Sequence, residues 1–449
     1  MSTKPIAAPI ASEATTGWRT RAFQIAWALG LAFYFLVYAS RSAPAVMIQH
    51  LSLAFGINAI GLSGILGAYY YTFSTTCLIA GAALDRVGGK KAVPVGVFIL
   101  AIGCLLFSLP MVSAGYAGRL LQGAGAAYAF TSAVYLAAHG FSRRWLATAI
   151  GVTQCFGMLG GFAGQFVVAH WLAHGVGWQT VWRWLAIASF VVGVLLLLIT
   201  PFETRPPTAG SGWTSLLRPY SIVFRNPQSY LCGAVAGLLF VPTTIGDMTW
   251  GVAFFQRDRM FSYHDAVVMD SLVPLGWVLG CPLFGWLADF AGRRKPVLMG
   301  GAIAMLLSTA GVTFGTGHKA AATGNLIFGI ASGAAMIPFI IMKEGNPDEV
   351  KGSATGSLNF FTFGVTALVG PIFADLLGKR LASSENRLAH FHASGVFWMV
   401  GIVVAILLSL LLRETGHERK PSLSQRSGYE SAVRARGTGF RGERENDSR

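Results

Sequence analysis

The chain has 449 residues, of which 53% are apolar and only 12% are charged, and its mean hydropathy is +0.56. Soluble domains carry about 25% charged residues, so this composition excludes a set of ordinary soluble domains and indicates an integral membrane protein. The 34 basic residues exceed the 19 acidic ones by 15, but they stand in short clusters between apolar stretches, which favours a membrane topology over nucleic-acid binding.

Both ends of the chain are polar. Residues 1–21 contain no apolar stretch that ends in a cleavage site, so we expect a cytoplasmic N-terminal tail and no removable signal peptide. Residues 413–449 are charged and rich in Gly and Ser, which predicts a disordered cytoplasmic tail. The five cysteines are scattered singly, an odd number that argues against a disulfide framework.

Twelve apolar stretches lie between the tails, each near the roughly 20 residues that a helix needs to cross the hydrocarbon core. In chain order they cover residues 22–48, 60–84, 92–111, 114–139, 146–172, 181–201, 230–255, 267–288, 296–315, 321–342, 353–377 and 393–412. A polar stretch at 202–229 separates the sixth from the seventh. We therefore expect an all-α membrane protein of twelve transmembrane helices, in two six-helix bundles at 22–201 and 230–412 joined by a cytoplasmic linker.

The basic residues predict the orientation of these helices. Connections after even-numbered spans are the richer in Lys and Arg, and they contain Arg86, Lys90, Lys91, Arg143, Arg144, Arg205, Arg218, Arg225, Arg293, Arg294, Lys295, Lys343 and Lys351. Because positive residues are enriched in cytoplasmic loops, both termini should be cytoplasmic. The expected location is the bacterial inner membrane.

One loop motif occurs twice, after the second and after the eighth span, at an offset of 204 residues. Its small, acidic and basic positions are Gly81, Asp85 and Arg86 in the first copy, and Gly285, Asp289 and Arg293 in the second. A small residue allows close helix packing, and an acidic residue at a helix end can hold a helix dipole or an Arg of the next helix. We interpret the two copies as gating elements that latch one bundle to the other; the alternative is an ordinary acidic–basic turn.

A second motif, Arg119-x-x-Gln122-Gly123-x-Gly125, lies in the fourth span. Together with the twelve spans and the two copies of the loop motif, it means that the chain resembles the major facilitator superfamily. The resemblance covers residues 20 to 413 and implies two pseudo-symmetric halves that rock around a substrate held between them. It also implies that Arg119 handles a proton or substrate. An Arg in the first helix is similar to the organic-anion and monocarboxylate branches of the superfamily.

Arg41 is the first candidate site residue, because an ionisable side chain inside a span is costly and usually functional. Tyr34, Tyr38 and Arg41 recur at i, i+4 and i+7, so they share one helix face and can clamp a carboxylate. The alternative is that the first helix ends near Ser40 and Arg41 reaches the outer interface.

Asp247 is the second candidate. It lies in the middle of the seventh span, where Pro242 and Gly246 can loosen the helix. A buried carboxyl group can load and release the coupling proton; the alternative is a structural partner for an Arg or for Thr hydroxyls.

Further polar or aromatic side chains inside spans are candidate substrate contacts. They are Arg119, Gln154, Gln165, Trp250 and Asn359. Arg119 can equally be an interfacial anchor, and Asn359 can equally join helices. Glycines 157, 160, 161 and 164 form overlapping G-x-x-x-G patterns that predict close helix packing.

The chain contains no phosphate-binding loop, nucleophile elbow or zinc motif, so we expect no enzyme activity, catalytic residue, cofactor or metal. The leading hypothesis is a monomeric secondary transporter that moves a small organic anion with protons. Alternatives are drug efflux, siderophore or vitamin transport, and, more remotely, a receptor or assembly factor that does not transport. The expected partners are a small anionic substrate and the lipid bilayer, with no nucleic acid.

Overall fold

The computed structural model describes residues 11–202, 213–347, 350–381 and 387–416, and within these ranges every regular element is a helix. We call the elements before residue 203 the N-terminal half. They are α1 (Ala11–Ser42), η1 (Ala43–Val46), α2 (Ile48–Phe55), α3 (Ala59–Val87), α4 (Gly89–Phe107), α5 (Val112–Gly140), α6 (Arg143–Ala173) and α7 (Trp178–Ile199).

The helix α8 (Trp213–Arg225) follows, and we call the elements after it the C-terminal half. They are α9 (Pro227–Val241), the π-helix η2 (Pro242–Trp250), α10 (Gly251–Arg257), α11 (Tyr263–Ala291), α12 (Lys295–Phe314), α13 (Gly317–Ser332), η3 (Gly333–Met336), α14 (Ile337–Glu344), α15 (Lys351–Leu381) and α16 (Arg387–Leu410). The seventh and tenth expected spans are each built from more than one helical segment, through η2 and η3.

The predicted twelve-helix membrane fold is confirmed. Ten helical segments are long and apolar enough to cross a membrane. The second and fourth expected spans, α3 and α5, have 29 residues each, about 43 Å of helix, which exceeds the roughly 30 Å of the hydrocarbon core. These two are less apolar because they pack on other helices: α3 contacts α5 and α15, and α5 contacts α1 and α4.

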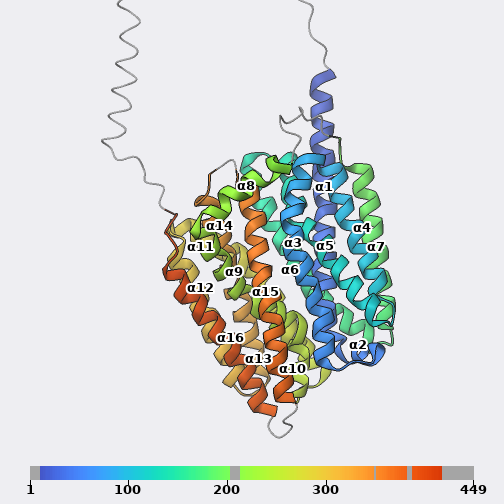
Figure 1. Cartoon of the computed structure of the whole chain (residues 1–449), viewed down its shortest axis with the longest axis vertical. Helices are drawn as coiled ribbons and strands as arrows, with labels where there is room; N and C mark the ends of the chain where they lie inside the picture. Colours follow the sequence, from blue (N-terminus) through green and yellow to red (C-terminus); the bar gives the residue numbers. More distant parts are fainter. Residues whose placement is uncertain (1–10, 203–212, 348–349, 382–386, 417–449) are drawn as a thin grey trace, which may run out of the picture.

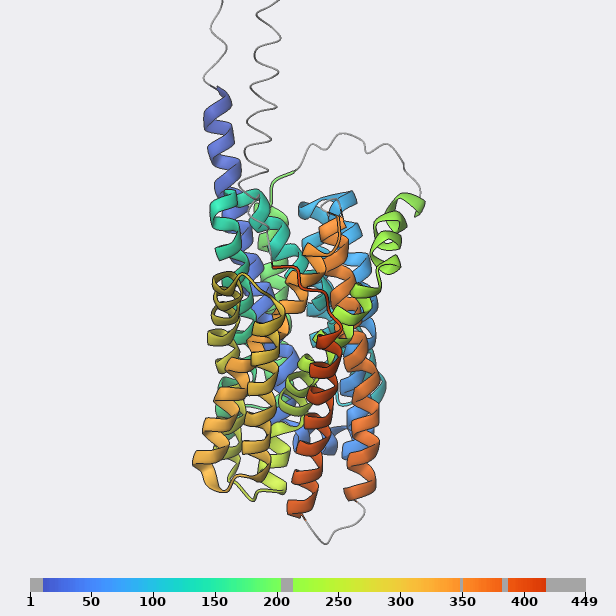
Figure 2. The same ribbon diagram turned by 90° about the vertical axis from the view of Figure 1, so that its left-hand side faces the viewer.

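The two halves lie side by side, with the N-terminal half to the right in Figure 1 and the C-terminal half to the left. The most extensive contacts between them are made by two helix pairs, α3 with α15 and α6 with α11, and η1 also contacts η2 and α10. The repeat relates these pairs, since α3 and α11 both carry the loop motif. We name the ends of the bundle by the helices found there, the α8 end and the α2 end; α1 begins and α16 ends at the α8 end (Figures 1 and 2).

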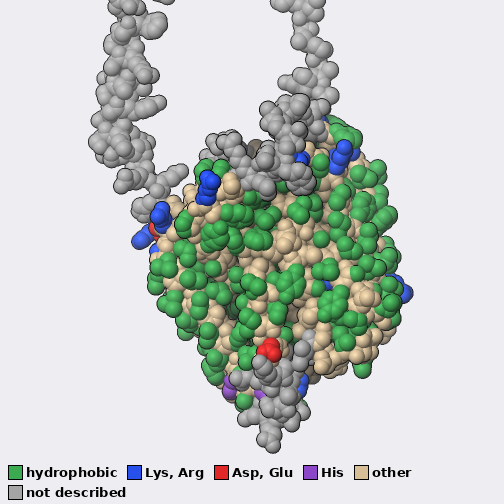
Figure 3. Space-filling view, viewed as in Figure 1, with side chains coloured by type: hydrophobic (Ala, Val, Ile, Leu, Met, Phe, Trp, Pro, Cys, Tyr) green, Lys and Arg blue, Asp and Glu red, His purple; other side chains and the backbone are tan. Residues whose placement is uncertain are grey.

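The surface is apolar around the middle of the bundle. In Figure 3, hydrophobic side chains cover most of the face in view, whereas the Lys and Arg side chains gather mainly toward the α8 end. Large apolar side chains such as Leu198, Leu307 and Leu368 are exposed, as they would be to lipid.

The first helix begins earlier than expected. We predicted a tail up to residue 21, but α1 starts at Ala11. Residues 11–21 include Ala, Glu and Arg, which favour helix, so the transmembrane helix extends beyond its apolar part. The disorder predicted for the C-terminal tail falls, from residue 417 onward, outside the described residues.

Glycines on α6 allow α1 to approach at backbone distance. A Cβ atom on Gly160 would collide with the backbone of Phe35, and one on Gly164 would collide with the backbone of Ala39. Backbone cannot move aside as a flexible side chain can, so these positions require glycine. The predicted packing role of the G-x-x-x-G pattern therefore agrees with the contacts of α1 with α6.

Gly160→Ala should therefore destabilise the protein by about 1–3 kcal/mol, because the added methyl group overpacks the α1–α6 contact. Gly151→Ala is the matched control on the same helix, since a Cβ there would meet nothing within 4 Å. Thermal unfolding of both variants in detergent measures the difference. Equal melting temperatures would show that α1 and α6 can separate at no cost.

Candidate functional site

Arg41 lies inside the bundle. It is in the last turn of α1, which continues to Ser42, and its side chain is only 2% exposed. The alternative in which the helix ends at Ser40 and Arg41 reaches the interface is therefore wrong. The guanidinium group has to find its interactions within the protein.

Aromatic rings surround this guanidinium group. The Cζ atom of Arg41 lies 4.5 Å from the ring centre of Tyr38, 4.9 Å from Phe73, 5.0 Å from Phe363 and 5.1 Å from Tyr69. Each of these distances is within the range of a cation–π contact. Phe363 comes from α15, so both halves contribute to the cage.

Only one side chain hydrogen-bonds to Arg41 in the described structure. Its Nε and Nη2 atoms donate to the hydroxyl of Tyr69, at 3.2 and 3.0 Å. The buried Nη1 atom has no partner, and no carboxylate pairs with Arg41 among the described residues. Tyr69 was missed from the sequence, where its only signal was a run of three tyrosines at 69–71.

Arg41 lines a small cavity of about 20 Å³ between the halves. Most of the expected substrate contacts line it, namely Tyr34, Tyr38, Arg41, Gln154 and Asn359. The Tyr34 hydroxyl donates to Gln154 Oε1 at 3.2 Å, so α1 and α6 hold each other's polar groups in place. The remaining wall is mainly aromatic and includes Phe130, Phe240, Phe339 and Phe363.

Arg119 is buried beside this site and is not an interfacial anchor. Its side chain is 2% exposed, and Nη1 donates to the Gln122 side chain at 2.8 Å and to the Ser40 carbonyl at 3.2 Å. It also lies 4.8 Å from the ring of Tyr69. Arg119 does not line the cavity; it supports the end of α1 and the tyrosine that binds Arg41.

Asp247 lies apart from Arg41. It is in η2, which confirms that the helix departs from α-geometry near Pro242 and Gly246. Its side chain is 6% exposed, and neither carboxylate oxygen has a hydrogen-bond partner in the described part of the chain. No Arg or Thr hydroxyl binds it, so the structural alternative is not supported. Asp247 lines a separate cavity of about 100 Å³ inside the C-terminal half.

A second buried carboxyl group faces Asp247. Asp270 of α11 is 2% exposed and is within hydrogen-bonding reach of the Asp247 side chain. Gln165 of α6 donates from Nε2 to Asp270 Oδ2 at 2.9 Å, so this predicted substrate contact instead links the halves. Sequence reasoning missed Asp270 because we placed it at the edge of a span; α11 begins at Tyr263, which puts Asp270 two turns inside.

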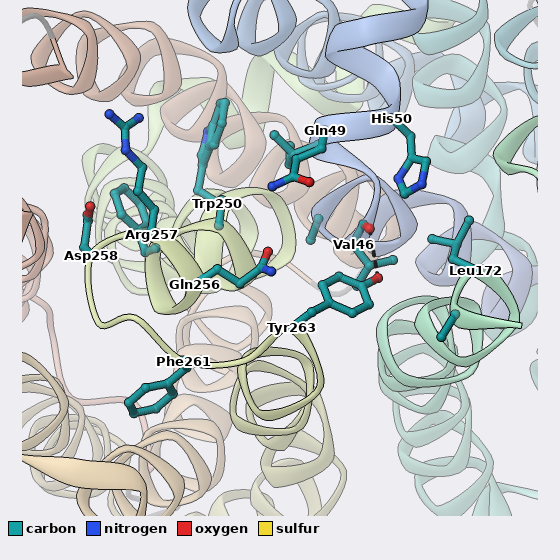
Figure 4. Close-up of a pocket in the computed structure, with 15 residues that line it drawn as sticks. Val46, Gln49, His50, Leu172, Trp250, Gln256, Arg257, Asp258, Phe261 and Tyr263 are labelled. Atoms are coloured by element: carbon teal, nitrogen blue, oxygen red, sulfur yellow. Dashed lines mark hydrogen bonds between the residues drawn. The ribbon is translucent and has the colours of Figure 1, made fainter. Parts of the chain in front are cut away.

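Trp250 lies at the boundary of two larger cavities at the α2 end. One measures about 730 Å³ and the other about 630 Å³, and both lie between the halves. Figure 4 shows the first, with Gln49 and His50 on one side and Gln256 and Arg257 on the other. The hydroxyl of Tyr263 donates across this cavity to the Val46 carbonyl at 3.0 Å. Trp250 does not line the cavity of Arg41.

The sequence profile of the Major Facilitator Superfamily matches residues 30–371 and, in a second alignment, residues 248–442. The chain belongs to the major facilitator superfamily. It is accordingly a membrane transporter of a small molecule and not an enzyme.

Relatives of this superfamily member differ in their named substrates. The Glucose transporter GlcP of Staphylococcus epidermidis is 30% identical over 41% of the chain, a match that spans only 38% of GlcP. Probable sulfoacetate transporter SauU of Cupriavidus necator is 22% identical over 85% of the chain and 86% of its own length. A crystal structure of a mutant nucleoside transporter NupG covers 87% of the chain and 99% of its own, with 15% identity and a TM-score of 0.69, which shows the shared fold.

The second copy of the superfamily member's loop motif forms a network inside the C-terminal half. Asp289 Oδ1 accepts from Arg294 Nη1 at 2.8 Å, and Arg294 Nη2 donates to Glu344 Oε1 at 2.9 Å. We expected Arg293 in this role, but Arg293 instead approaches Glu414 at 3.9 Å. The described bonds of this network therefore join α11, the start of α12 and α14, all within the C-terminal half.

The first copy is described only in part. The side chain of Asp85 lies outside the described residues, and Arg86 is exposed. Gly81 packs near Tyr220 of α8, whose hydroxyl would lie 3.3 Å from a Cβ atom there and donates to the Leu78 carbonyl at 2.7 Å. A Cβ on Gly285, the matching position, would meet nothing within 4 Å. The gating role of both copies stays a prediction.

Glu414 holds the start of α12. Its carboxylate accepts from the backbone amides of Arg294 at 2.6 Å and Lys295 at 3.2 Å, where an anion also interacts favourably with the helix dipole. Burial by itself raises the pKa of Glu414, but hydrogen bonds from the backbone, including those of Arg294, Gly416 and Lys295, outweigh it and lower the pKa below the usual value.

Glu414→Gln should therefore lower the melting temperature slightly at neutral pH. Because the folded pKa lies below the unfolded one, the carboxylate stabilises the fold above its usual pKa and loses this effect as the pH falls through the folded value. Melting curves of wild type and variant should converge on acidification. A difference that is the same at every pH would show that the charge of Glu414 is irrelevant.

Proposed function

We propose that this superfamily member moves a small organic anion across the bacterial inner membrane, together with protons, as a monomer with both termini in the cytoplasm. The observation that carries the proposal is Arg41, a buried cation with a free Nη1 atom and no carboxylate partner in the described chain. It lines a cavity formed by both halves.

An unpaired charge inside a membrane protein is costly, and its cost falls when an opposite charge binds. Aromatic rings and the Tyr69 hydroxyl stabilise Arg41 in part, but neither neutralises it. A carboxylate or sulfonate of a substrate would supply the missing charge through a charge-assisted hydrogen bond to Nη1. This argument favours an anion over a neutral or cationic substrate.

The rest of the cavity suits a small organic molecule. Gln154 and Asn359 present amide groups, and the tyrosine pair Tyr34 and Tyr38 presents hydroxyls. Aromatic faces of both halves would enclose an apolar part of the substrate. The present volume of about 20 Å³ is close to that of a single water, so binding requires the halves to move apart around the site.

Similarity to a protein named for sulfoacetate supports an anionic substrate, whereas similarity to proteins named for glucose and nucleosides leaves a neutral substrate as the main competitor. Arg41 discriminates between them, because a neutral sugar or nucleoside gains little from an unpaired guanidinium group. The experiment below includes both kinds of compound.

The gathering of Lys and Arg toward the α8 end supports a cytoplasmic location for that end, by the positive-inside rule. The two large cavities at the α2 end then face the outside. Asp247 is the proposed coupling residue, because its carboxyl group is buried near the contact of the halves and has no cationic partner.

Arg41→Ala should abolish binding of the anion, and Arg41→Lys should weaken it about 10- to 100-fold, because the charge remains but the planar fork is lost. Thermal-shift titrations of purified protein with small carboxylates and sulfonates, a sugar and a nucleoside would identify the ligand and measure these losses. Arg183→Ala, an exposed cation on α7, is the control that should bind normally. A ligand that stabilises Arg41→Ala as well as wild type would contradict the anion assignment.

Asp247→Asn should abolish accumulation of the substrate against its gradient, because Asn mimics a carboxyl group that never releases its proton. Exchange of labelled for unlabelled substrate at equal pH should survive. Uptake into proteoliposomes, with and without a pH gradient, measures both. Undiminished accumulation driven by the pH gradient would assign coupling to another residue.

A further inference from the structure

Acceptors outnumber donors around Asp247 and Asp270. Both carboxylate oxygens of Asp247 and the Oε1 atom of Gln165 are buried without a hydrogen-bond partner in the described chain. The donors directed at this group are Gln165 Nε2, which donates to Asp270 and also lies within reach of the Asp247 side chain, and the backbone of Val252, which donates to Asp270. Buried acceptors without donors are strongly disfavoured, so three of them at one place indicate a missing hydrogen.

Several other polar side chains around the cavity direct a donor to a carbonyl group and away from the carboxyl pair. Thr309, Thr313 and Ser394 each donate to a carbonyl of their own helix, and the Asn325 amide donates to the Met269 carbonyl at 2.8 Å. No Lys, Arg or His lines the cavity among the described residues. The described lining of the cavity therefore offers no countercharge, and its titratable groups are Asp247 and Asp270 themselves.

The local backbone is built to admit these carboxyl groups. A Cβ atom on Gly251 would collide with the Asp270 carboxyl group, so glycine is required where the chain leaves η2. The π-helix places Asp247 four residues before this glycine, opposite α11. Single π-helical turns are frequent at functional sites.

We propose that Asp247 and Asp270 form one proton-binding site in which a single proton is shared between two carboxyl groups, and that Gln165 is its positioning residue. The proposal deepens the proposed function, since it identifies the coupling site as a pair. One added proton supplies an O–H donor to the facing carboxylate and removes one of two adjacent negative charges. Sites of this kind titrate as a unit and not as two separate acids.

Gln165 connects the state of the pair to the N-terminal half. Its bond to Asp270 is charge-assisted when that carboxyl group is ionised and weaker when the group is neutral. One turn earlier on α6, the Gly161 carbonyl accepts from Ser42 Oγ at 2.8 Å, and Ser42 directly follows Arg41. Protonation of the pair thus changes the contact between Gln165 and Asp270, which joins the halves. This contact lies one turn of α6 away from the hydrogen bond to Ser42, the residue that follows Arg41.

Infrared titration of purified full-length protein tests the pair without any substrate. The carboxyl C=O band of protonated Asp should be followed over a pH series in wild type, Asp247→Asn, Asp270→Asn and the double variant. We expect each single variant to shift the titration of the remaining carboxyl group, and the double variant to lose the band. Asp258→Asn removes a buried carboxyl group that lines another cavity, and should leave the pair's titration unchanged.

Two outcomes would overturn the proposal. If either carboxyl group titrates in its partner's absence as it does in wild type, the two acids are independent. If addition of sodium chloride at constant pH, with potassium chloride as the reference, removes the band, the site binds a metal cation and not a shared proton.

Gln165→Leu keeps the size of the side chain but removes its donor, and it serves if an Asn variant does not fold. We expect it to shift the pair's titration, which a purely structural role in packing would not do; an unchanged titration would exclude Gln165 as a positioning residue.

In proteoliposomes, Asp270→Asn should lose pH-driven accumulation as completely as Asp247→Asn, and the double variant should accumulate no less substrate than either single variant. The infrared signal needs no substrate, so it can contradict the shared proton while the anion assignment stands. Substrate binding can likewise contradict the anion assignment while the shared proton stands.

Discussion

An ionisable group inside an apolar bundle must have a partner, and the interior of this protein is organised around that requirement. Arg119 meets it in part, because Nη1 donates to the Gln122 side chain and the Ser40 carbonyl while the buried Nε atom has no partner in the described chain. Arg41 meets it only partly, through one tyrosine hydroxyl and four aromatic faces, and keeps one buried nitrogen free. Asp247 does not meet it at all within the described chain. Arg41 and Asp247 differ from Arg119 in that each lines a cavity, so these two groups are the ones placed to meet the proposed ligand and proton.

Close helix contacts are what allow such groups to sit so deep. Glycines on α6 bring α1 against it at backbone distance, which fixes the face of α1 that carries Tyr34, Tyr38 and Arg41. On the other side of α6, Gln165 reaches α11. The same helix thus borders the cavity of Arg41 through Gln154 and the carboxyl pair through Gln165, and these two sites do not share a cavity. Their separation means that an anion and a proton would not compete for one place.

Hydropathy and the repeated loop motif were enough to predict twelve helices and the superfamily, because both are local properties of the sequence. Side-chain spacing on one helix likewise predicted that Tyr34, Tyr38 and Arg41 share a face. Pairings between distant helices were not predictable in this way. Nothing near position 69 in the sequence points to Arg41, and Asp270 became visible as a buried acid only once the start of α11 was known. The same limit explains why Arg294 and not Arg293 holds Asp289, since both lie in the turn between α11 and α12 and only the packing decides between them.

The π-helix has a consequence for how the seventh span can change shape. Its nine residues end immediately before Gly251, whose missing side chain leaves room for Asp270. Rewinding this stretch into an ordinary α-helix would rotate every later residue about the axis, and Gly251 would no longer face α11. A residue with a side chain would take its place, and none fits against a carboxyl group that already excludes a methyl group. Gly251 thus restricts the helical register, so that this segment keeps its π-helical winding for as long as α10 and α11 remain in contact.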